Sequence, residues 1–264
     1  MGKVIAVTNQ KGEVGKTTTA INLAASLAVS EFRVLLVDSD PQGNATSGVG
    51  IAKDSTKPSL YNVLLGDSEI ADALVKTELE GLHLLPANKN LVGANLELVD
   101  LEYRDIRLRE KVSQVKSTYD FVIIDCPPAL DLLTLNALMA SDSVLIPIQC
   151  EFFALEGISE LIGTIDRIRE TMKHPLQIEG ILITMFDDRT NLTRQVAADL
   201  REFFGTDVLQ TVIPRSVRLA EAPSHGKPIL TYDIRSRGAE SYIHLAKEIL
   251  ERDHTTAKSA QGLG

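Results

Sequence analysis

Short apolar runs alternate with longer segments of helical periodicity along nearly the whole chain. The apolar runs are rich in valine, isoleucine and leucine, which is typical of strands buried on both faces of a sheet. We predict strands at 4–8, 33–38, 82–86, 121–125, 143–148, 177–185 and 208–213. We predict helices at 17–28, 59–65, 69–75, 88–115 with one break near residue 100, 130–140, 156–172, 191–204 and 238–252. This alternation predicts an α/β fold with a mostly parallel, doubly wound sheet and helices on both faces.

The length and composition are those of a soluble globular protein. The chain has 264 residues, of which 44% are hydrophobic and 24% are charged. No internal repeat or linker divides it, so we predict a single domain over residues 1–253. Residues 254–264 are small and polar, which predicts a flexible C-terminal tail. No apolar run reaches the length of a membrane span, and the chain begins with a predicted core strand rather than a signal peptide.

A loop with two glycines, at residues 9–18, joins the first predicted strand to the first predicted helix. A strand, a glycine loop, Gly-Lys-Thr and then a helix form the context that a phosphate-binding loop requires. Backbone N–H groups of the loop and the helix start would surround nucleotide phosphates. The Lys16 ammonium would neutralise β- and γ-phosphate oxygens, and the Thr17 hydroxyl would coordinate Mg²⁺. The residues that we expect at the nucleotide are Lys11, Gly12, Glu13, Val14, Gly15, Lys16, Thr17 and Thr18.

The loop departs from the usual pattern G-x-x-x-x-G-K-[ST], because Gln10 stands where the first glycine belongs and Lys11 is an additional lysine. This combination is the deviant Walker A loop, and here the chain resembles the ParA/MinD family of P-loop ATPases. The resemblance implies that the chain binds ATP and Mg²⁺ and hydrolyses ATP. It also gives Lys11 a catalytic role, because in relatives this lysine reaches across a dimer interface to the phosphates of the other subunit. We therefore expect a homodimer when ATP is bound.

Glu13 departs from the family pattern, in which a second glycine usually stands at this position. A carboxylate close to a triphosphate would be repelled, and glutamate tolerates a positive φ less well than glycine does. We expect Glu13 to weaken ATP binding or dimerisation, unless its side chain points into solvent or pairs with Lys11.

Three aspartates follow predicted strands, at the sheet edge where such folds bind ligands. Residues 38–42 read Asp-Ser-Asp-Pro-Gln, and residues 121–125 read Phe-Val-Ile-Ile-Asp, which is the Walker B pattern. Hydrolysis requires a water molecule held in line with the γ-phosphate, and by resemblance this role falls on Asp40. The predicted catalytic residues are Lys11, Lys16 and Asp40, and the predicted metal site is Thr17, Asp38 and Asp125.

Two further segments, at 184–187 and 213–215, resemble the family segments that close over the adenine. Each follows a predicted strand, so both fall near the nucleotide edge of the sheet. The apolar side chains of Met185 and Pro214 suit packing against a purine, and Arg215 follows Pro214. A core or turn position is the alternative for either segment.

Within the family, the chain resembles short Soj-like partitioning proteins from Lys3 to about Arg252. The specific pieces of this match are at 8–12, 38–46, 154–157 and 218–223. The resemblance implies a role in chromosome or plasmid segregation, with a ParB-like partner that stimulates ATP hydrolysis. It further implies a cytoplasmic, nucleoid-associated protein. Because the P-loop strand begins at Lys3, we expect no N-terminal helix-turn-helix and no specific operator binding.

Any contact with DNA must come from a local basic patch, because the net charge of the chain is −9. Relatives bind double-stranded DNA without sequence preference. The positions that match their DNA-contacting arginines are Arg189 and Arg218, and the additional candidates are Arg194, Arg215 and Lys227. Solvated surface charges with no ligand are the alternative for each of them.

Two other functions remain as alternatives, a MinD-like positioning ATPase and a P-loop enzyme that acts on a small molecule. MinD-like proteins end in a basic amphipathic helix, whereas the last predicted helix here carries as many acids as bases near its end, so we expect no membrane binding. Nitrogenase-type iron proteins bridge a cluster through cysteines, but Cys126 and Cys150 do not match that arrangement and should be buried thiols. For a small-molecule enzyme the sequence offers no separate substrate constellation.

Overall fold

In the computed structural model, which describes residues 2–54 and 58–261, the apolar runs form one eight-stranded sheet. The strands are β1 (Lys3–Val7), β2 (Val34–Asp38), β3 (Val75–Lys76), β4 (Leu82–Leu85), β5 (Phe121–Asp125), β6 (Ser143–Gln149), β7 (Gln177–Phe186) and β8 (Val208–Pro214). Their order across the sheet is β3-β4-β2-β5-β1-β6-β7-β8. Adjacent strands are parallel except β3, which pairs antiparallel with β4 at one edge. The predicted mostly parallel α/β sheet is confirmed.

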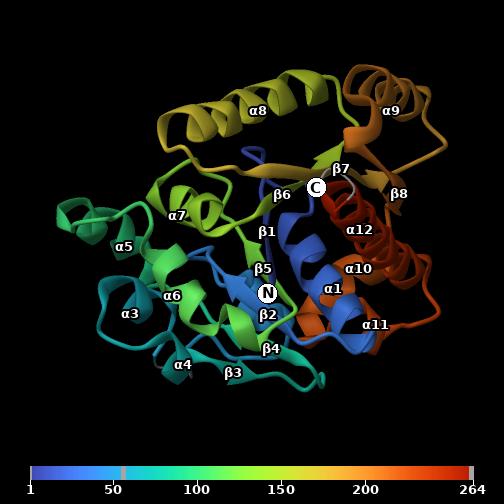
Figure 1. Cartoon of the computed structure of the whole chain (residues 1–264). Helices are drawn as coiled ribbons and strands as arrows, with labels where there is room; N and C mark the ends of the chain where they lie inside the picture. Colours follow the sequence, from blue (N-terminus) through green and yellow to red (C-terminus); the bar gives the residue numbers. More distant parts are fainter. Residues whose placement is uncertain (1, 55–57, 262–264) are drawn as a thin grey trace.

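Helices connect the strands and cover both faces of the sheet (Figure 1). They are α1 (Lys16–Val29), α2 (Asn44–Gly48), α3 (Leu60–Leu65), α4 (Ile70–Ala73), α5 (Leu91–Glu97), α6 (Arg107–Val115), α7 (Leu132–Ala140), α8 (Ala154–Thr171), α9 (Asn191–Phe204), α10 (Val217–Glu221), α11 (Ile229–Tyr232) and α12 (Arg237–Gln261). Short 3-10 helices lie at Leu98–Asp100, Lys116–Thr118, Gly205–Asp207 and Ala222–His225. The predicted break near residue 100 is confirmed, since it separates α5 from α6. None of the helices in the described part of the chain is long and apolar enough to cross a membrane.

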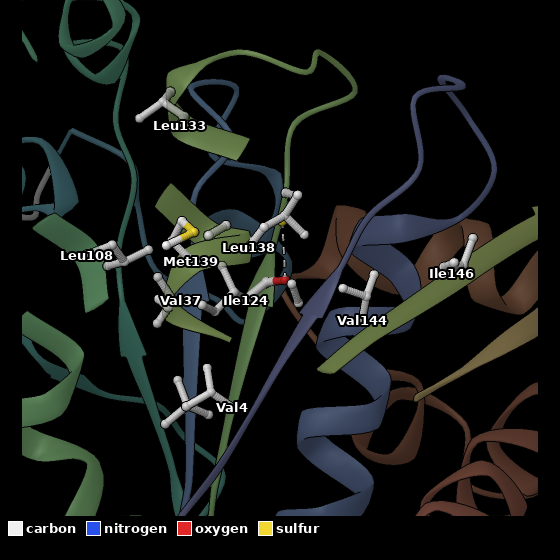
Figure 2. Packing of buried hydrophobic residues seen from close by; sticks show 14 of the residues in the cluster. Val4, Val37, Leu108, Ile124, Leu133, Leu138, Met139, Val144 and Ile146 are labelled. Atoms are coloured by element: carbon white, nitrogen blue, oxygen red, sulfur yellow. Dashed lines mark hydrogen bonds between the residues drawn. The ribbon is translucent and has the colours of Figure 1, made fainter. Parts of the chain in front are cut away.

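Alternate residues of each strand build two hydrophobic cores, one on each face of the sheet. Val4 and Val37 belong to the core that helices α3 to α9 cover, where Leu108 of α6 packs near them (Figure 2). Their sequence neighbours Ile5 and Leu36 belong to the second core, under α1, α2 and α10 to α12. Both faces of the strands are therefore buried, which explains why the strands read as continuous apolar runs.

Most predicted helix boundaries are shifted by a few residues, and two of the differences concern the edge strand and the last helix. The helix predicted at 69–75 was wrong at its end, because the backbone is extended at Leu74 and Val75 pairs with Leu84 as part of β3. A pairing partner at the sheet edge decides this conformation, and the local sequence does not reveal it. The last helix, α12, continues to Gln261, so its end does not coincide with the predicted boundary at residue 253. Residues 262–264 of the predicted tail lie outside the described residues.

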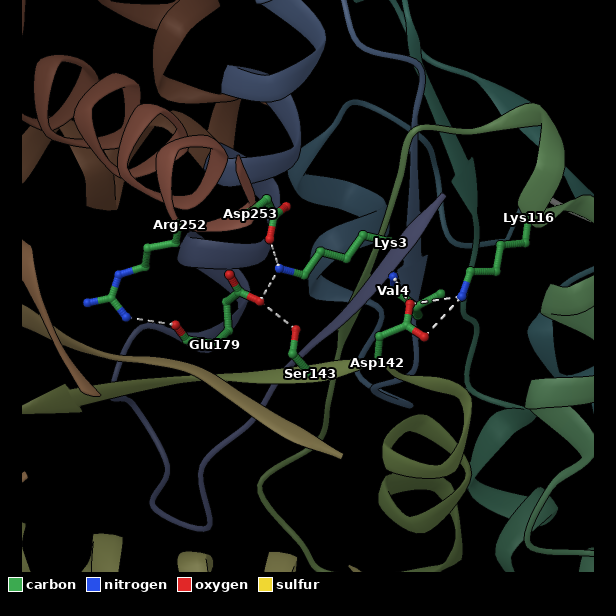
Figure 3. A network of polar contacts seen from close by, with 8 residues as sticks. All are labelled: Lys3, Val4, Lys116, Asp142, Ser143, Glu179, Arg252 and Asp253. Atoms are coloured by element: carbon green, nitrogen blue, oxygen red, sulfur yellow. Dashed lines mark hydrogen bonds and ion pairs between the residues drawn. The ribbon is translucent and has the colours of Figure 1, made fainter. Parts of the chain in front are cut away.

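A polar network ties α12 to the sheet at the amino ends of the central strands (Figure 3). Lys3 pairs with Glu179 at 2.6 Å and with Asp253 of α12, and Glu179 also accepts a hydrogen bond from the Ser143 hydroxyl. Burial alone would lower the pKa of Lys3, but its two carboxylate partners raise it. One ammonium thus pairs with two carboxylates at the edge opposite the phosphate-binding loop. The phosphate-binding loop and the predicted acids lie at the other, carboxyl edge of the sheet.

Candidate nucleotide site

The predicted phosphate-binding loop joins β1 to α1 at the carboxyl edge of the sheet. Gly15 precedes α1 with a φ of +85°, in the left-handed region that favours glycine. A Cβ added to Gly15 would meet nothing closer than 3.8 Å, so the backbone conformation rather than crowding requires glycine here. The first turn of α1 contains no acidic residue. The positive end of this 14-residue helix is therefore free to bind an anion.

Glu13 is exposed in this loop and has a φ of +60°. The structure confirms that this position suits glycine, because a non-glycine residue in the left-handed region costs about 1–2 kcal/mol. Lys11 pairs with Glu151 rather than with Glu13, so the pairing considered for Lys11 and Glu13 does not form. Glu13 therefore places an exposed charge on a strained part of the loop.

The two lysines of the loop are in different environments. Lys16 is buried, and its ammonium donates to the Lys11 carbonyl at 2.7 Å. Burial lowers the pKa of Lys16, while the negative charge of Asp125 acts in the opposite direction. The Lys11 side chain is 52% exposed and forms its ion pair with Glu151, just beyond β6. Lys16 therefore belongs to the interior of the loop, and Lys11 to its outer surface.

The parallel strand register brings the predicted acids together. Asp38 at the end of β2 is the register partner of Asp125 at the end of β5, and Asp125 is also opposite Val7, which leads into the loop. Adjacent strands lie about 4.8 Å apart, so the two carboxylates share one small region below the loop. Asp40 follows Asp38 by two residues and is 8% exposed. The three acids predicted from separate motifs form one cluster.

Asp125 has the least satisfied carboxylate of the three. Its side chain is fully buried, and neither carboxylate oxygen has a hydrogen-bond partner within the described residues. Burial raises its pKa well above the usual range, and the nearby charge of Asp38 adds to this effect. The Thr17 hydroxyl and the positive charge of Lys16 lower the pKa of Asp125, but by less than burial raises it. An unpartnered buried carboxylate is the kind of group that a metal ion stabilises in its charged form.

Asp38 already has protein partners for both oxygens. Its Oδ2 accepts from the Thr46 N–H and hydroxyl, each at 2.7 Å, and its Oδ1 accepts from the Asp40 N–H at 3.2 Å. Burial raises the pKa of Asp38 to about 6, although the hydrogen bonds from Thr46 oppose the shift. Asp40 accepts from the Gln42 N–H through Oδ1 at 2.8 Å, which leaves its Oδ2 without a donor among the described residues. The roles of Asp38 and Asp40 in metal binding and hydrolysis stay predictions.

The cluster fits Mg²⁺ as one ion shared with a nucleotide. No group of three or more acidic, histidine or cysteine side chains in the described part of the chain could hold a metal by itself. Mg²⁺ usually takes only one or two carboxylates and completes its shell with water and substrate phosphates. Asp125 and the Thr17 hydroxyl at the start of α1 supply such a partial set. Cys126 and Cys150 are buried free thiols, as predicted.

The two segments predicted to lie near the adenine are neighbours in the structure. Phe186 at the end of β7 is the register partner of Pro214 at the end of β8, and the Arg215 N–H donates to the Phe186 carbonyl at 3.1 Å. Met185 has a φ of +50°, another left-handed non-glycine residue. The hydroxyl of Thr184 lies 2.8 Å from the Val14 carbonyl and fastens β7 to the phosphate-binding loop. The first segment thus contacts the loop and the second lies beside the first, while contact of either with a purine stays a prediction.

Arg189 and Arg218, predicted to contact DNA, follow the adjacent strands β7 and β8. Both side chains are exposed, and both are held by carboxylates of the same chain. Arg189 pairs with Asp187, and Arg218 pairs with Glu221 at 3.1 Å and with Asp233 at 3.5 Å. The two arginines thus follow neighbouring strands at the carboxyl edge of the sheet, and each is in a charge-compensated state.

Sequence reasoning missed the residues that hold the predicted ones in place. They are Thr46, which binds Asp38; Thr184, which fastens the loop; and Glu151, which pairs with Lys11. It also missed the buried Ser39, whose hydroxyl has no partner within the described residues. Thr46 and Thr184 lie inside segments with a family-like pattern, which was the available signal. Glu151 and Ser39 carried no signal of their own.

Comparison with known proteins agrees with this geometry. Residues 2–178 match the model of a family described as "AAA domain". The chain is 55% identical to the sporulation initiation inhibitor protein Soj of Bacillus subtilis, over 94% of this chain and 98% of that protein. It is 53% identical to the chromosome partitioning protein ParA of Myxococcus xanthus, over 96% and 89% of the two chains. A solved structure of cobyrinic acid a,c-diamide synthase from Mycobacterium smegmatis, with a bound ATP analogue and magnesium, is 38% identical with a TM-score of 0.85, over 97% of each chain.

Proposed function

The chain belongs to the Soj/ParA family of P-loop ATPases, which bind ATP and Mg²⁺, and we propose that it is an ATP-dependent switch for DNA segregation. In the proposed cycle, ATP closes two copies into a dimer, and the dimer binds double-stranded DNA without sequence preference. A ParB-like partner then stimulates hydrolysis, and the copies separate. This cycle would operate in the cytoplasm, on the nucleoid.

The different positions of the two lysines carry this proposal. Lys16 is buried and bound to a carbonyl of its own loop, where it can meet the phosphates of a nucleotide in the same subunit. Lys11 is half exposed on the outside of the loop, and among the described residues its ammonium forms a weak surface pair with Glu151. A cation in that position can turn toward a second copy and neutralise transition-state charge there, as an arginine finger does.

The other predicted site residues would bind the metal ion, the attacking water, the adenine and the phosphates. Bound Mg²⁺ supplies positive charge against the phosphates, and Asp125 with Thr17 would hold it, with Asp38 behind them. Asp40 would orient the attacking water through its free oxygen. Met185, Pro214 and Arg215 would enclose the adenine. Gly12, Glu13, Val14, Gly15 and Thr18 would surround the phosphates with Lys16.

DNA binding is assigned to Arg189 and Arg218. They lie beyond the ends of two paired strands, so two copies of this surface would form a small basic patch on a dimer. A few phosphate contacts are enough for weak, salt-sensitive binding, even when the net charge is −9. The proposed cycle does not require the recognition of a specific base sequence in the DNA.

Size-exclusion chromatography and DNA co-sedimentation test the cycle when each is run with ADP, with ATP and with a non-hydrolysable ATP analogue. We expect a monomer without DNA in ADP, and a DNA-bound dimer in the analogue. A protein that stays monomeric and free of DNA in all three states would contradict the proposal.

A small-molecule enzyme is the second candidate, because the solved structure cited above has the name of an amide synthase and the same fold. The two functions predict different activators of ATP hydrolysis. A segregation ATPase should respond to DNA together with a ParB-like protein, whereas a synthase should respond to cobyrinic acid with an amide donor. An ATPase rate that rises only with the metabolite would favour the second candidate.

A further inference from the structure

Asp187 holds Arg189 in a two-bond, side-by-side pair at the end of β7. The guanidinium Nε donates to Oδ1 at 2.7 Å, and Nη2 donates to Oδ2 at 2.6 Å. The Arg189 side chain is 81% exposed, while that of Asp187 is 21% exposed. The pair lowers the pKa of Asp187 to about 2, so the carboxylate is ionised at neutral pH. The two donors that recognise a planar or tetrahedral anion are thus already occupied by an anion of the same chain.

A DNA phosphate uses the same donors. Arginine binds phosphate through two parallel N–H···O bonds, with a geometry close to that of its pair with a carboxylate. We propose that Asp187 is an internal substitute for a DNA phosphate, which occupies Arg189 until the DNA backbone displaces it. This inference rests on the proposed DNA binding and adds the element that limits its strength.

The surroundings of the pair support a phosphate as the competing anion. Arg189 lines a cavity of about 730 Å³, and Arg215 and Arg237 line it too. Asp187, Asp188 and Glu240 line the same cavity, so the three guanidinium charges are matched by three carboxylates in the free chain. An entering phosphate that takes Arg189 from Asp187 would also come under the attraction of the other arginines.

The local turn makes a clean variant possible. The Arg189 N–H donates to Asp187 Oδ1 at 3.2 Å, so the aspartate side chain also stabilises the turn after β7. Asp187→Asn keeps an acceptor at Oδ1 and removes the charge that holds the guanidinium. Asp187→Ser is a second neutral variant that can accept from the same N–H.

Asp188→Asn is the matched control. Asp188 is exposed, is the next residue along the chain, and makes no hydrogen bond to Arg189 among the described contacts. The Asp188→Asn variant removes the same formal charge from the same cavity, but leaves the Asp187–Arg189 pair intact. A generic charge effect would therefore appear equally in both variants.

The test is fluorescence anisotropy with a random-sequence DNA duplex, in the presence of the non-hydrolysable ATP analogue. Asp187→Asn and Asp187→Ser should bind about three- to tenfold more tightly than the parent, since each dimer would release two such pairs. Asp188→Asn should change affinity by less than about twofold. In an Arg189→Ala background, Asp187→Asn should give no gain, because the gain passes through that guanidinium.

The outcomes separate this inference from the function on which it rests. A parent that binds no DNA with any nucleotide would overturn the proposed function. A parent that binds DNA, with equal effects of Asp187→Asn and Asp188→Asn, would overturn the phosphate-substitute role alone. A gain that persists without Arg189 would overturn it as well.

Discussion

The buried charged residues next to the phosphate-binding loop and the cations on the surface differ in how firmly the fold holds their side chains. The carboxyl-edge cluster (Lys16, Asp38, Asp40 and Asp125) is buried, and strand register places Asp38 beside Asp125. The outward cations (Lys11, Arg189 and Arg218) are exposed, and each of them pairs with an exposed or partly exposed acid of the same chain. The residues expected to bind the nucleotide are thus already in place, whereas the cations expected to contact a second copy or DNA are held in ion pairs within the chain.

This difference follows from solvation. A buried carboxylate without a partner is costly, so a metal ion and phosphates that pair with Asp125 and Lys16 should stabilise the cluster. An exposed ion pair is weak, so an outside phosphate can break it at little cost. Binding of the nucleotide should therefore be strong and insensitive to salt. Contacts with a second copy or with DNA should be weak, reversible and sensitive to salt.

The largest effect expected in the carboxyl-edge cluster is on turnover. Asp40→Ala should lower the rate of ATP hydrolysis by about 10²–10⁴-fold, because the attacking water loses its acceptor. ATP binding and dimerisation should persist, since Lys16 and the metal ion still meet the phosphate charge. Phosphate release assays with analogue-binding controls measure both. Wild-type hydrolysis in Asp40→Ala would remove Asp40 from the catalytic role.

Among the outward cations, Arg218→Glu should reduce DNA affinity by at least about tenfold, because each dimer loses two phosphate contacts and gains two repulsive charges. ATP-dependent dimerisation should be unchanged. Arg33→Glu is the control, because Arg33 is an exposed arginine paired with Asp120 at the opposite edge of the sheet. DNA affinity of the parent should also fall steeply with salt. Equal losses in the two variants would show a general charge effect instead of a patch.

The free energy of unfolding without metal tests whether the buried carboxylate of Asp125 destabilises the folded chain. Because the pKa of Asp125 is raised in the folded chain, folded protein binds more protons than unfolded protein above the ordinary pKa. Stability should therefore fall as pH rises from the ordinary aspartate pKa toward the raised value. Asp125→Asn removes this loss and should raise the free energy of unfolding by about 1–3 kcal/mol near neutral pH.

Urea unfolding in EDTA over a pH series measures this effect, with the exposed Asp188→Asn as control. The same Asp125→Asn variant should lose most of the stabilisation that Mg²⁺ and ATP give the parent. A variant that is less stable than the parent in EDTA would mean that Asp125 is satisfied in the free protein.

The smallest effect concerns Glu13. Glu13→Gly should raise stability by about 1 kcal/mol through the relief of its positive φ, and should strengthen ATP binding or dimerisation severalfold by removing a like charge. Glu31→Gly is the matched control, because exposed Glu31 has a φ of +67° after α1, away from the loop. Both variants should gain stability, and only Glu13→Gly should gain nucleotide affinity. Equal nucleotide affinity in both would mean that Glu13 carries no functional weight.

The fold and the acid cluster could be predicted because their signals are local. Each aspartate ends an apolar strand or lies two residues beyond one, and parallel strands bring their carboxyl ends to one edge, so motifs far apart in sequence had to converge. The edge strand β3 could not be predicted, because two residues carry no periodicity and its partner β4 determines its conformation.

The restraints on the outward cations could not be predicted for another reason. The sequence suggested Glu13 as a partner of Lys11, whereas side-chain positions in the structure pair Lys11 with the distant Glu151. Asp187 stands two residues from Arg189, but this spacing alone does not distinguish a bonded pair from two solvated charges. Such contacts are decided by the turn geometry, which only the structure gives.

One measurement compares the two lysines directly and tests the distinction between a prepared site and restrained surface cations. ATP affinity and sedimentation velocity with the non-hydrolysable analogue should be recorded for Lys11→Ala and Lys16→Ala. Lys16→Ala should lose ATP binding, and hence dimerisation, because it removes the buried charge of the loop. Lys11→Ala should bind ATP within about threefold of the parent and yet remain monomeric. A Lys11→Ala protein that dimerises and hydrolyses ATP as the parent does would contradict the account.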